Sequence, residues 1–450
     1  MSVRFCTTLT ILSLGFNTKG TRKMEDQEKP IEANEQNVIT DVLPEDERRR
    51  KMASIVQIDS ISPIEGADRI VVATMKGLGW KVVVQKGEFE VGDRATYFEI
   101  DSLLKKDDER YAFLLDRCLR KFVSKSGQVL YEGIRIKTIK LKGIFSQGLL
   151  IPLDKFPEIT GAIAETTDGK TVFTNVVREK TQDENGNDIY VDKEVQEELL
   201  GANVTYLLKV EHYDDVKERF APVCNCCHIA ADAYGPFPIQ IPKTDEARIQ
   251  SNTDLFEELK DRHFEVTVKA DGSSTTVFYA PSIDAENPLG VCSRNIRQKP
   301  EMKDGTVPMF WQVANKYKVG EALQKHYEET GTEWAVQAEM VGPGIQGARN
   351  HETEHTMKVF RIWDITNQCY VKPDVRRAFC KENNIPHVEV QSEDMQVFHE
   401  FTDVDSLLKF AEGKTAEGYE REGLVFKTCD DGPQRSFKAV SNRYLMKIED

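Results

Sequence analysis

The stretch Phe264-Glu-Val-Thr-Val-Lys-Ala-Asp-Gly272 decides how we interpret the second half of this chain. Its apolar residues alternate with polar ones, which predicts a strand with one buried face. Asp271-Gly272 predicts a tight turn, and the alternating run Thr275–Tyr279 predicts a second strand that carries the chain back. Lys269 is therefore expected at the end of a strand, where an amine that loses its proton can act as a nucleophile. Taken alone, however, this short stretch fits a solvated lysine beside a turn better.

The composition is that of a soluble protein with more than one domain. Its 450 residues are enough for two or three domains with separate cores. No run of about 18 apolar residues is present, so we expect no transmembrane helix and no membrane partner. The net charge of −15 argues against a nucleic-acid partner unless basic residues gather locally. Nine cysteines in a chain of this size do not indicate a disulfide framework, so an intracellular, reducing compartment is expected, either the cytoplasm or the nucleus.

Residues 1–51 are expected to form a disordered or targeting segment. Residues 25–50 are polar and dense in charge, which is typical of disorder. The first 23 residues contain no acidic side chain, which is typical of a mitochondrial presequence, although a short secretory core at Leu9–Phe16, a disordered tail or a start at Met24 also fits. The basic residues in this stretch are Arg4, Lys19, Arg22 and Lys23.

Residues 52–222 are expected to form a small antiparallel β-barrel. Short β-branched runs from Ile55 onward alternate with turn signals at the spacing of barrel strands. A helical stretch is expected at about 108–122, and an acidic hairpin or loop insertion at about 160–200. Residues 223–235 are expected to be a linker. This linker contains Cys224-Asn-Cys-Cys-His228, whose adjacent ligands suit zinc poorly because no distant second pair follows.

A basic segment of this first domain is the candidate RNA-binding surface. Between Arg117 and Lys142, eight basic residues accompany one acidic residue. The alternating run that begins at Ile134 slips phase at Thr138, and a bulge there would gather the basic side chains on one face and bury the apolar ones opposite. Contact with RNA phosphates is the hypothesis, and a solvated sheet edge protected by lysines is the alternative. The predicted RNA-binding residues are Arg135, Lys137 and Lys140, with Lys142 on the same face, and the predicted buried residues are Ile134, Ile136, Ile139 and Leu141.

Several blocks follow Lys269 in a fixed order. They are Ser293-Arg294-Asn295, Trp334–Gly344 with Glu339, Lys358–Ile365, Arg421-Glu422-Gly423 and Ser436-Phe437-Lys438. In this order the blocks resemble the covalent nucleotidyltransferase superfamily of polynucleotide ligases and mRNA capping enzymes. Within it, the chain is most similar to ATP-dependent RNA ligases that carry an N-terminal OB module. The resemblance covers about residues 52–450.

This resemblance implies a fold, an activity and partners. The fold is of the α+β class, with an OB-type β-barrel followed at 236–450 by a nucleotidyltransferase domain of antiparallel sheets with flanking helices. The activity is the sealing of RNA 3′-OH and 5′-phosphate ends through a lysyl-AMP intermediate. The cofactors are ATP and either Mg²⁺ or Mn²⁺. The partner is RNA, expected as a nicked duplex, and the protein is expected to act as a monomer.

The resemblance also implies a role for each matching residue. Lys269 is the nucleophile, within a block whose Asp271 and Gly272 also bind the nucleotide. Phe360 is expected to stack on adenine, with Trp363 second, because alternation would place the two side chains on opposite faces of one strand. The remaining roles are contact with ribose or a hydrated metal for Glu339, metal binding for Glu422, the α-phosphate for Lys438, nucleotide or RNA 5′-phosphate for Arg294, and the leaving pyrophosphate for Arg248.

The chemistry requires a lysine that is deprotonated at neutral pH. A free lysine amine has a pKa near 10.4, and neighbouring positive charge lowers it. A bound metal, Lys438 and Arg248 are the expected sources of that charge. One residue departs from the family pattern, since Ser436 stands where many relatives have the first lysine of Lys-x-Lys. Either Lys427 or Lys447 covers the missing contact, or one lysine is enough.

Three alternatives remain open. A capping guanylyltransferase usually carries its OB domain after the last motif, whereas only a few residues follow that motif here, and the same argument weakens a DNA ligase. A non-catalytic RNA-binding protein is the third, because Gly66-Ala-Asp-Arg69 and Val91-Gly-Asp93 resemble turns of tRNA-binding OB modules. The intact Lys269 and its partner motifs speak against such a decayed domain.

Overall fold

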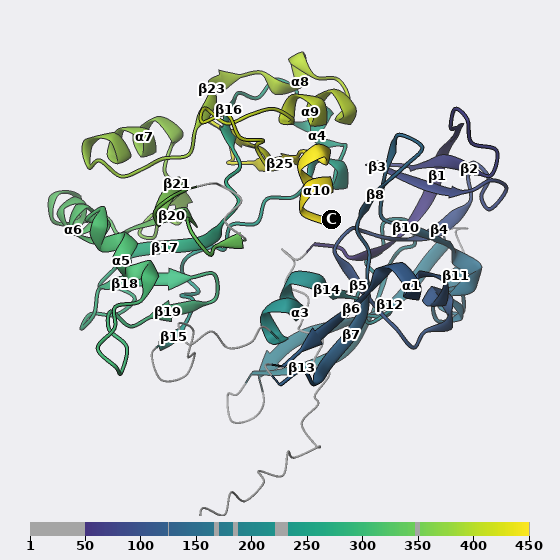
Figure 1. Ribbon diagram of the computed structural model, residues 1–450, viewed down its shortest axis with the longest axis horizontal. Coiled ribbons are helices and arrows are strands. Elements are labelled where there is room, and N and C mark those ends of the chain that lie inside the picture. The colour runs from purple at the N-terminus through teal and green to yellow at the C-terminus, as the bar shows by residue number, and fades with distance from the viewer. Residues whose placement is uncertain are drawn as a thin grey trace, which may run out of the picture. The chain divides into compact units, whose positions relative to one another are not determined.

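The computed structural model describes residues 50–449 except 125, 166–170, 183–187, 221–232 and 347–351 (Figure 1). The expected targeting segment and the Cys224–His228 cluster lie outside the described residues. Among the helices of the described ranges, none is long and apolar enough to cross a membrane.

The N-terminal half is built from short antiparallel strands, as their alternating apolar residues predicted. A five-stranded sheet has the order β10-β4-β1-β2-β3, and a four-stranded sheet has the order β14-β5-β7-β6. Strand β1 pairs with β4 through its first half and with β2 through its second half, with a bulge between Ile58 and Ser60. The strands are β1 (Ala53–Pro63), β2 (Ile70–Met75), β3 (Leu78–Gln85), β4 (Arg94–Phe98), β5 (Ser102–Lys105), β6 (Leu119–Val123), β7 (Val129–Arg135), β10 (Leu149–Pro152) and β14 (Glu211–His212).

The acidic segment near residues 160–200 contains a third sheet. It has the order β11-β12-β13 and consists of β11 (Ile163–Glu165), β12 (Thr171–Gln182) and β13 (Asp188–Glu198). Phe173 of β12 is fully buried and packs in the same apolar cluster as Phe98 and Phe156. This sheet is therefore fixed to the barrel by a shared core, because burying a phenylalanine stabilises the folded state by about 1.5–3 kcal/mol.

The predicted continuous basic strand is wrong. The chain ends β7 at Arg135 and begins β8 (Thr138–Leu141), which pairs with β9 (Ile144–Gln147) in a separate two-stranded sheet. Between the two strands, the backbone of Ile136 hydrogen-bonds to Ser102 and Asp101, at 2.8 and 2.7 Å. These bonds hold Ile136 against the end of β5, so the chain changes sheet instead of forming a bulge. The predicted helix near 108–122 is also shorter, since only η1 (Glu109–Leu114) and α1 (Leu115–Cys118) precede β6.

The C-terminal half contains two antiparallel sheets. The larger has the order β15-β19-β18-β17-β20-β21-β22, and the smaller has the order β23-β16-β24-β25. Helices α5 (Met309–Lys316), α6 (Val319–Thr330) and α7 (Pro373–Glu382) pack against the larger sheet (Figure 1). The strands are β15 (Ala233–Pro236), β16 (Phe264–Val268), β17 (Ser273–Tyr279), β18 (Leu289–Ser293), β19 (Ile296–Gln298), β20 (Trp334–Val341), β21 (Thr356–Asp364), β22 (Cys369–Tyr370), β23 (Val390–Met395), β24 (Gly423–Thr428) and β25 (Ser436–Val440).

Short helical segments cover the smaller sheet. They are η3 (Ile249–Ser251), α4 (Leu255–Glu258), α8 (Val397–Glu400) and α9 (Val404–Ala411). Helix α10 (Asn442–Glu449) instead contacts β8 of the N-terminal half, to which η2 (Leu153–Lys155), α2 (Pro157–Thr160) and α3 (Tyr213–Phe220) also belong. Val440 and Leu445, at the C-terminal end of the chain, are buried in the same cluster as Trp80 and other core residues of the five-stranded sheet. The apolar core of the barrel is thus completed by residues more than 300 positions away in the sequence.

Candidate active site

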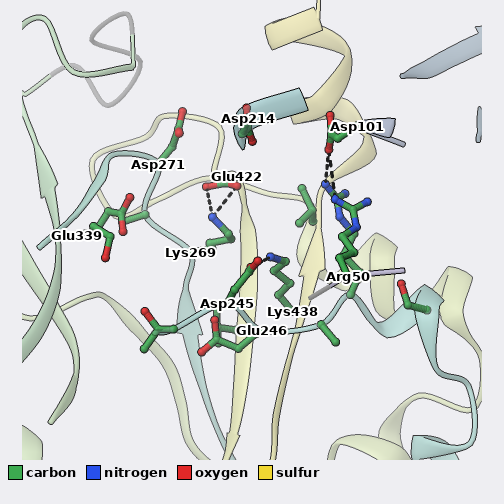
Figure 2. A pocket seen from close by; sticks show the side chains of 18 of the residues that line it. Arg50, Asp101, Asp214, Asp245, Glu246, Lys269, Asp271, Glu339, Glu422 and Lys438 are labelled. Carbon is green, nitrogen blue, oxygen red and sulfur yellow. Dashed lines mark hydrogen bonds and ion pairs between the residues drawn. The ribbon is translucent and has the colours of Figure 1, made fainter. Parts of the chain in front are cut away.

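A cavity of about 780 Å³ contains every residue that the sequence predicted for catalysis, nucleotide binding or metal binding. Cavities of this size are typical of small-molecule sites. Figure 2 shows Lys269 near its centre, with Glu422, Asp271 and Glu339 on one side and Arg50 and Asp101 on the other. The predicted residues that line it are Arg248, Lys269, Asp271, Gly272, Arg294, Glu339, Phe360, Glu422 and Lys438.

Strand pairing fixes Lys269 beside Glu422. Strand β16 is buried along its whole length and pairs with β24, with Val268 opposite Leu424. The backbone N–H of Lys269 then donates to the carbonyl of Gly423 at 3.0 Å. Glu422 directly precedes β24, so the carboxylate and the amine emerge at the same end of the sheet. Their side chains form an ion pair of 2.7 Å.

The predicted tight turn back is wrong, because the segment Lys269–Gly272 crosses from the smaller sheet to the larger one. Gly272 brings this segment against strand β20. A Cβ atom at this position would lie 2.2 Å from the carbonyl oxygen of Met340 and 2.9 Å from the side chain of Glu339. Neither contact is sterically possible, so only glycine allows this close approach. The approach lets the backbone N–H of Gly272 hydrogen-bond to the Glu339 carboxylate. The segment therefore delivers Glu339 to the same cavity as Lys269.

The electrostatic environment of Lys269 differs from the predicted one. Burial alone lowers the pKa of its amine, but the carboxylates of Glu422 and Glu339 outweigh burial and raise the pKa above its ordinary value. The predicted lowering of this pKa includes the charge of a bound metal and so stays a prediction; in the protein by itself the surrounding carboxylates dominate. The expected cations Lys438 and Arg248 do line the cavity, but the carboxylates have the larger effect on the pKa of Lys269.

A bound cation would stabilise the charged form of the two glutamates, Glu339 and Glu422. Burial raises the pKa of Glu339 to about 8, against the opposing charge of Lys269 and with added repulsion from Glu422 and Asp271. Burial likewise raises the pKa of Glu422. Within the described ranges, no group of three or more His, Cys, Asp or Glu side chains is arranged as a metal site. Two buried carboxylates next to a polyphosphate-sized cavity nevertheless fit a hydrated Mg²⁺ or Mn²⁺, because such ions take only a few protein oxygens and keep several waters.

Lys438 and its partner form the cavity wall next to Lys269. Lys438 lies on β25 opposite Val425, and its amine donates to Asp245 at 2.7 Å (Figure 2). Desolvation lowers the pKa of Lys438. The charge of Lys438 outweighs partial desolvation of the exposed Asp245 and holds the pKa of this carboxylate at about 2. Asp245 was not predicted from the sequence. Its position in the segment ahead of Arg248, which opens the domain, was the only available signal.

Arg248 connects this wall to the barrel. Its guanidinium lies 3.5 Å from Asp101 and 6.0 Å from the ring centre of Trp80, both of which belong to the N-terminal half. The side chain is 9% exposed, and among the described residues its Nε and Nη1 atoms have no hydrogen-bond partner. Buried guanidinium donors without a partner are costly, so they indicate an anion that completes the site. Arg50 also lines the cavity and pairs with Glu99 at 2.6 Å.

The barrel residues of this site were missed by sequence reasoning. Trp80, Glu99 and Asp101 stand among ordinary strand residues, roughly 150 or more positions before Arg248. No local pattern marks them, because their role arises only from packing of the barrel against the residues near Arg248. Arg50 was placed at the end of the expected disordered segment, whereas the structure assigns it to the cavity wall.

Lys427 lies next to the position of the missing family lysine. Strands β24 and β25 place Lys427 directly opposite Ser436, and paired residues project to the same face of a sheet. Lys427 lines the cavity, and burial together with Arg376 and Arg361 lowers its pKa to about 7. Lys447 instead lies outside the cavity and pairs with Glu420.

A bulge in β21 places Phe360 in the cavity. Val359 pairs with Ala338 and Arg361 pairs with Gln337, so Phe360 is the extra residue. Val359 and Ile362 pack in the helix-covered core, whereas Phe360 lines the cavity and Trp363 packs in a separate cluster with Phe237 and Ile241. The expectation that Phe360 and Trp363 face opposite sides of a regular strand is therefore wrong, because the bulge shifts the alternation by one residue.

The three predicted RNA-binding residues do not share one strand face. Arg135 donates to Asp101 at 2.8 Å and lies 4.0 Å from the ring centre of Tyr213. Lys137 is half-buried between β7 and β8, and Lys140 is exposed on β8, 5.1 Å from the ring centre of Phe145. Ile134 and Ile136 are buried as predicted, but Ile139 is 40% exposed, so the predicted apolar face is only half correct.

Comparison with known proteins supports the same interpretation of both halves. An OB-fold domain model matches residues 52–153, which confirms the predicted OB-type barrel, and a model described as RNA ligase matches residues 262–440. Among curated proteins, none matches the chain.

Solved structures of the RNA ligase of Naegleria gruberi match nearly the whole described chain. A mutant with AMP and manganese is 31% identical with a TM-score of 0.67, and the match covers 88% of this chain and 99% of that one. A mutant with ATP and manganese is 31% identical with a TM-score of 0.67, covering 89% and 100%. The same ligase with pyrophosphate is 32% identical with a TM-score of 0.67, again covering 89% and 100%. This agreement confirms the predicted α+β fold.

Proposed function

The chain belongs to the ATP-dependent RNA ligases that combine an N-terminal OB domain with a nucleotidyltransferase domain, and from this premise we propose that it joins RNA 3′-OH and 5′-phosphate ends through a lysyl-AMP intermediate on Lys269. The observation that carries the proposal is the position of Lys269. Its amine lies 2.7 Å from Glu422 in a cavity that it shares with Glu339, Lys438 and Arg248.

The proposed chemistry consists of three displacements at phosphorus. First, the Lys269 amine attacks the α-phosphorus of ATP, which forms an N–P bond and releases pyrophosphate. AMP then passes to the 5′-phosphate of an RNA end, and finally a 3′-OH attacks that phosphate and releases AMP. In each step the protein contributes mainly position and charge, since phosphoryl transfer requires little other help.

The cofactors are ATP and a divalent metal, Mg²⁺ or Mn²⁺, for which Glu339 and Glu422 are the proposed ligands. When bound there, the metal supplies positive charge that lowers the pKa of Lys269 and neutralises phosphate oxygens. Glu422 also accepts the hydrogen bonds of the Lys269 ammonium and so fixes the direction of the amine. The raised pKa of Lys269 in the protein alone then describes the resting enzyme rather than the reacting one.

The remaining cavity residues would bind the parts of the nucleotide. Lys438 is proposed to hold the α-phosphate, because its buried amine lies beside Lys269 on the cavity wall. The unpartnered donors of Arg248 suit the leaving pyrophosphate, and Phe360 offers a ring face for adenine. Arg294 is exposed at the cavity and is assigned to nucleotide or the RNA 5′-phosphate. Asp271 and Gly272 shape the segment next to the nucleophile, and Lys427 takes the place of the missing motif lysine.

RNA is the proposed partner, most simply as a nicked duplex sealed by one copy of the protein. Lys137 and Lys140 are proposed to contact its backbone, with Lys142 nearby and exposed. Arg135 is no longer proposed to contact RNA, because it pairs with Asp101, the carboxylate that also pairs with Arg248. We retain the boundaries 52–222, 223–235 and 236–450 for the barrel, linker and catalytic domain.

Transfer of label from α-labelled ATP tests the nucleophile. The wild-type protein should acquire covalent AMP with ATP and not with GTP, and Lys269→Ala should acquire none. Lys260→Ala, an exposed lysine upstream of β16, is the matched control and should label as the wild type does. Persistent labelling of Lys269→Ala would refute the assignment.

A panel of nicked duplexes tests the substrate. RNA ends with 3′-OH and 5′-phosphate should be sealed, and nicks with DNA on both sides should be sealed slowly or not at all. Preferential sealing of DNA nicks would identify a DNA ligase instead. Charge reversal at Lys137 and Lys140 should weaken RNA binding and reduce its salt dependence, and unchanged affinity would exclude that surface.

A further inference from the structure

We propose that Tyr444 is a positioning residue for nucleotidyl transfer, acting through Asp271, and that helix α10 holds it in place by its contacts with the barrel. This inference rests on the proposed function, since it names an additional residue for the same reaction. Neither the motif order nor any local pattern in the sequence singled out Tyr444.

The hydroxyl of Tyr444 donates a hydrogen bond to the carboxylate of Asp271. Tyr444 is 7% exposed, so this contact is shielded from water. Asp271 stands two residues after the nucleophile and directly before Gly272, whose N–H binds Glu339. The hydrogen bond therefore holds in place the segment Lys269–Gly272. This segment begins with the proposed nucleophile and ends with the N–H that binds Glu339.

Helix α10 is attached to a second part of the active site. The backbone N–H of Ser441, directly before the helix, donates to the carbonyl of Glu422 at 2.8 Å, and the N–H of Tyr444 donates to the hydroxyl of Ser441 at 3.2 Å. Tyr444 is thus linked through Ser441 to the residue that pairs with Lys269. Asp271 and Glu422 are therefore both connected to the short helix α10.

The other contacts of α10 lead to the barrel. Leu445 is buried with Trp80 in the core of the five-stranded sheet. Asn442 accepts a hydrogen bond of 3.0 Å from Gln147 on β9, and Gln147 also contacts Thr138 on β8 at 3.3 Å. The strand that begins at Thr138 carries Lys140, a proposed RNA contact. The helix therefore lies between the candidate RNA-binding hairpin β8–β9 and Asp271.

The arrangement explains why a tyrosine suits this position. A side chain can hold a charged group in one position only if the helix that carries it is itself held in place. Leu445 and Asn442 supply these by anchoring α10 on both sides of Tyr444. The tyrosine ring spans the distance to Asp271 with only two side-chain torsions to order, whereas a longer flexible donor would lose more entropy.

The experiment compares Tyr444→Phe with the wild type in single-turnover formation of covalent AMP. Loss of one hydrogen bond to a charged group corresponds to a decrease in rate of about tenfold or more at saturating ATP. The KM for ATP should change by less than about twofold, because no proposed nucleotide contact is removed. Tyr419→Phe, at a tyrosine that is 42% exposed and outside the cavity lining, is the matched control and should react like the wild type.

A double-mutant cycle separates positioning from general structural damage. If Tyr444 acts through Asp271, adding Tyr444→Phe to Asp271→Asn should cause little further loss, whereas independent effects would multiply. Asn442→Ala should cause a smaller decrease in the same direction, since it loosens the helix but keeps the hydroxyl. Thermal unfolding of each variant shows whether the fold is kept.

The possible failures are distinguishable. Wild-type protein that acquires no AMP would refute the proposed function and with it the role of Tyr444. Wild-type protein that is labelled while Tyr444→Phe reacts at the same rate would refute only the assignment of Tyr444. Multiplicative losses in the double mutant would likewise exclude action through Asp271.

Discussion

Two lysines of the same cavity, Lys269 and Lys427, have opposite electrostatic surroundings. Lys427 is buried and Lys269 is half-buried, and desolvation lowers the pKa of each. Around Lys269 the carboxylates of Glu422 and Glu339 reverse that effect and raise the pKa. Around Lys427 the cations Arg376 and Arg361 reinforce it, so that the pKa is about 7.

The difference teaches that the protein alone does not activate its nucleophile. The lysine proposed for catalysis has its pKa raised by two carboxylates, whereas Lys427, elsewhere in the cavity lining, has a pKa of about 7. A negative site of this kind gains its reactive state when cations arrive, because they compensate the carboxylates and repel the proton of the amine. In the proposed mechanism, the ion pair of Lys269 with Glu422 keeps the amine protonated until nucleotide and metal bind.

The largest effect is expected when the carboxylate next to Lys269 is neutralised. Glu422→Gln removes a proposed metal ligand that is worth several kcal/mol in the transition state, so formation of covalent AMP should slow by about a thousandfold. The rate should be measured over a range of Mn²⁺ concentrations. Glu420→Gln, two residues earlier and paired with Lys447 outside the cavity, is the control and should have little effect. A rate for Glu422→Gln near that of the wild type would show that this carboxylate is dispensable.

A second prediction concerns stability and tests the environment of Lys427. The pKa of Lys427 is about 7 in the folded protein, whereas its ordinary value, expected in the unfolded chain, is 10.5. Between these two pH values the unfolded chain binds more protons than the folded one, so the free energy of unfolding rises with pH. Below pH 7 both states are protonated and the cost of the buried charge is complete. Between pH 7 and 10 the free energy of unfolding of the wild type should therefore increase by up to about 1.4 kcal/mol per pH unit relative to that of Lys427→Met. Parallel curves for the two proteins would contradict the lowered pKa.

A third prediction tests the raised pKa of Lys269 through the pH dependence of the reaction. Only the deprotonated amine attacks phosphorus, so at limiting metal the rate of adenylylation should rise about tenfold per pH unit through the neutral range. Saturating metal should move the whole profile to lower pH, because added positive charge lowers the pKa of the amine. Removal of metal with a chelator should abolish labelling. A profile that is flat and independent of metal would show that deprotonation of Lys269 does not limit the reaction.

The smallest effect is expected at Ser436, opposite Lys427. If Lys427 covers the family's missing lysine, Ser436→Ala should change the rate of adenylylation by less than about twofold, since the serine contributes no charge. Lys427→Met should slow the same step by about tenfold, the value of one charged hydrogen bond. The reverse ranking of these two variants would assign the contact to Ser436.

The residues that the sequence proposed for the site line one cavity because they stand in strand-end motifs. Lys269, Glu339, Glu422 and Lys438 each follow, end or lie in an alternating run, and antiparallel pairing then brings the ends of those runs together. Phe360 was predicted to face the nucleotide, and it does line the cavity. The alternation that was used to separate it from Trp363 failed, because a one-residue bulge cannot be read from apolar and polar residues alone.

The basic segment shows a different reason for failure. The phase slip at Thr138 was interpreted as a bulge within one strand, but the backbone of Ile136 hydrogen-bonds to residues at the start of β5, and the chain then joins another sheet at Thr138. Which of two sheets a strand joins depends on partners that are distant in the sequence. Arg135 was consequently assigned to RNA, although in the structure it pairs with Asp101 inside the protein.

By itself, the sequence determined the order of motifs, the OB-type barrel and the family, and it predicted Lys269 as nucleophile with acidic and basic companions, because these depend on residue types at short spacing. The tertiary structure alone decided the charge state of Lys269, the contribution of Trp80, Asp101 and Arg50 to the cavity, and the contact between Tyr444 and Asp271. The physical reason is the same in each case. A pKa and a cavity wall are sums over neighbours in space, and chain segments separated by hundreds of residues supply most of those neighbours.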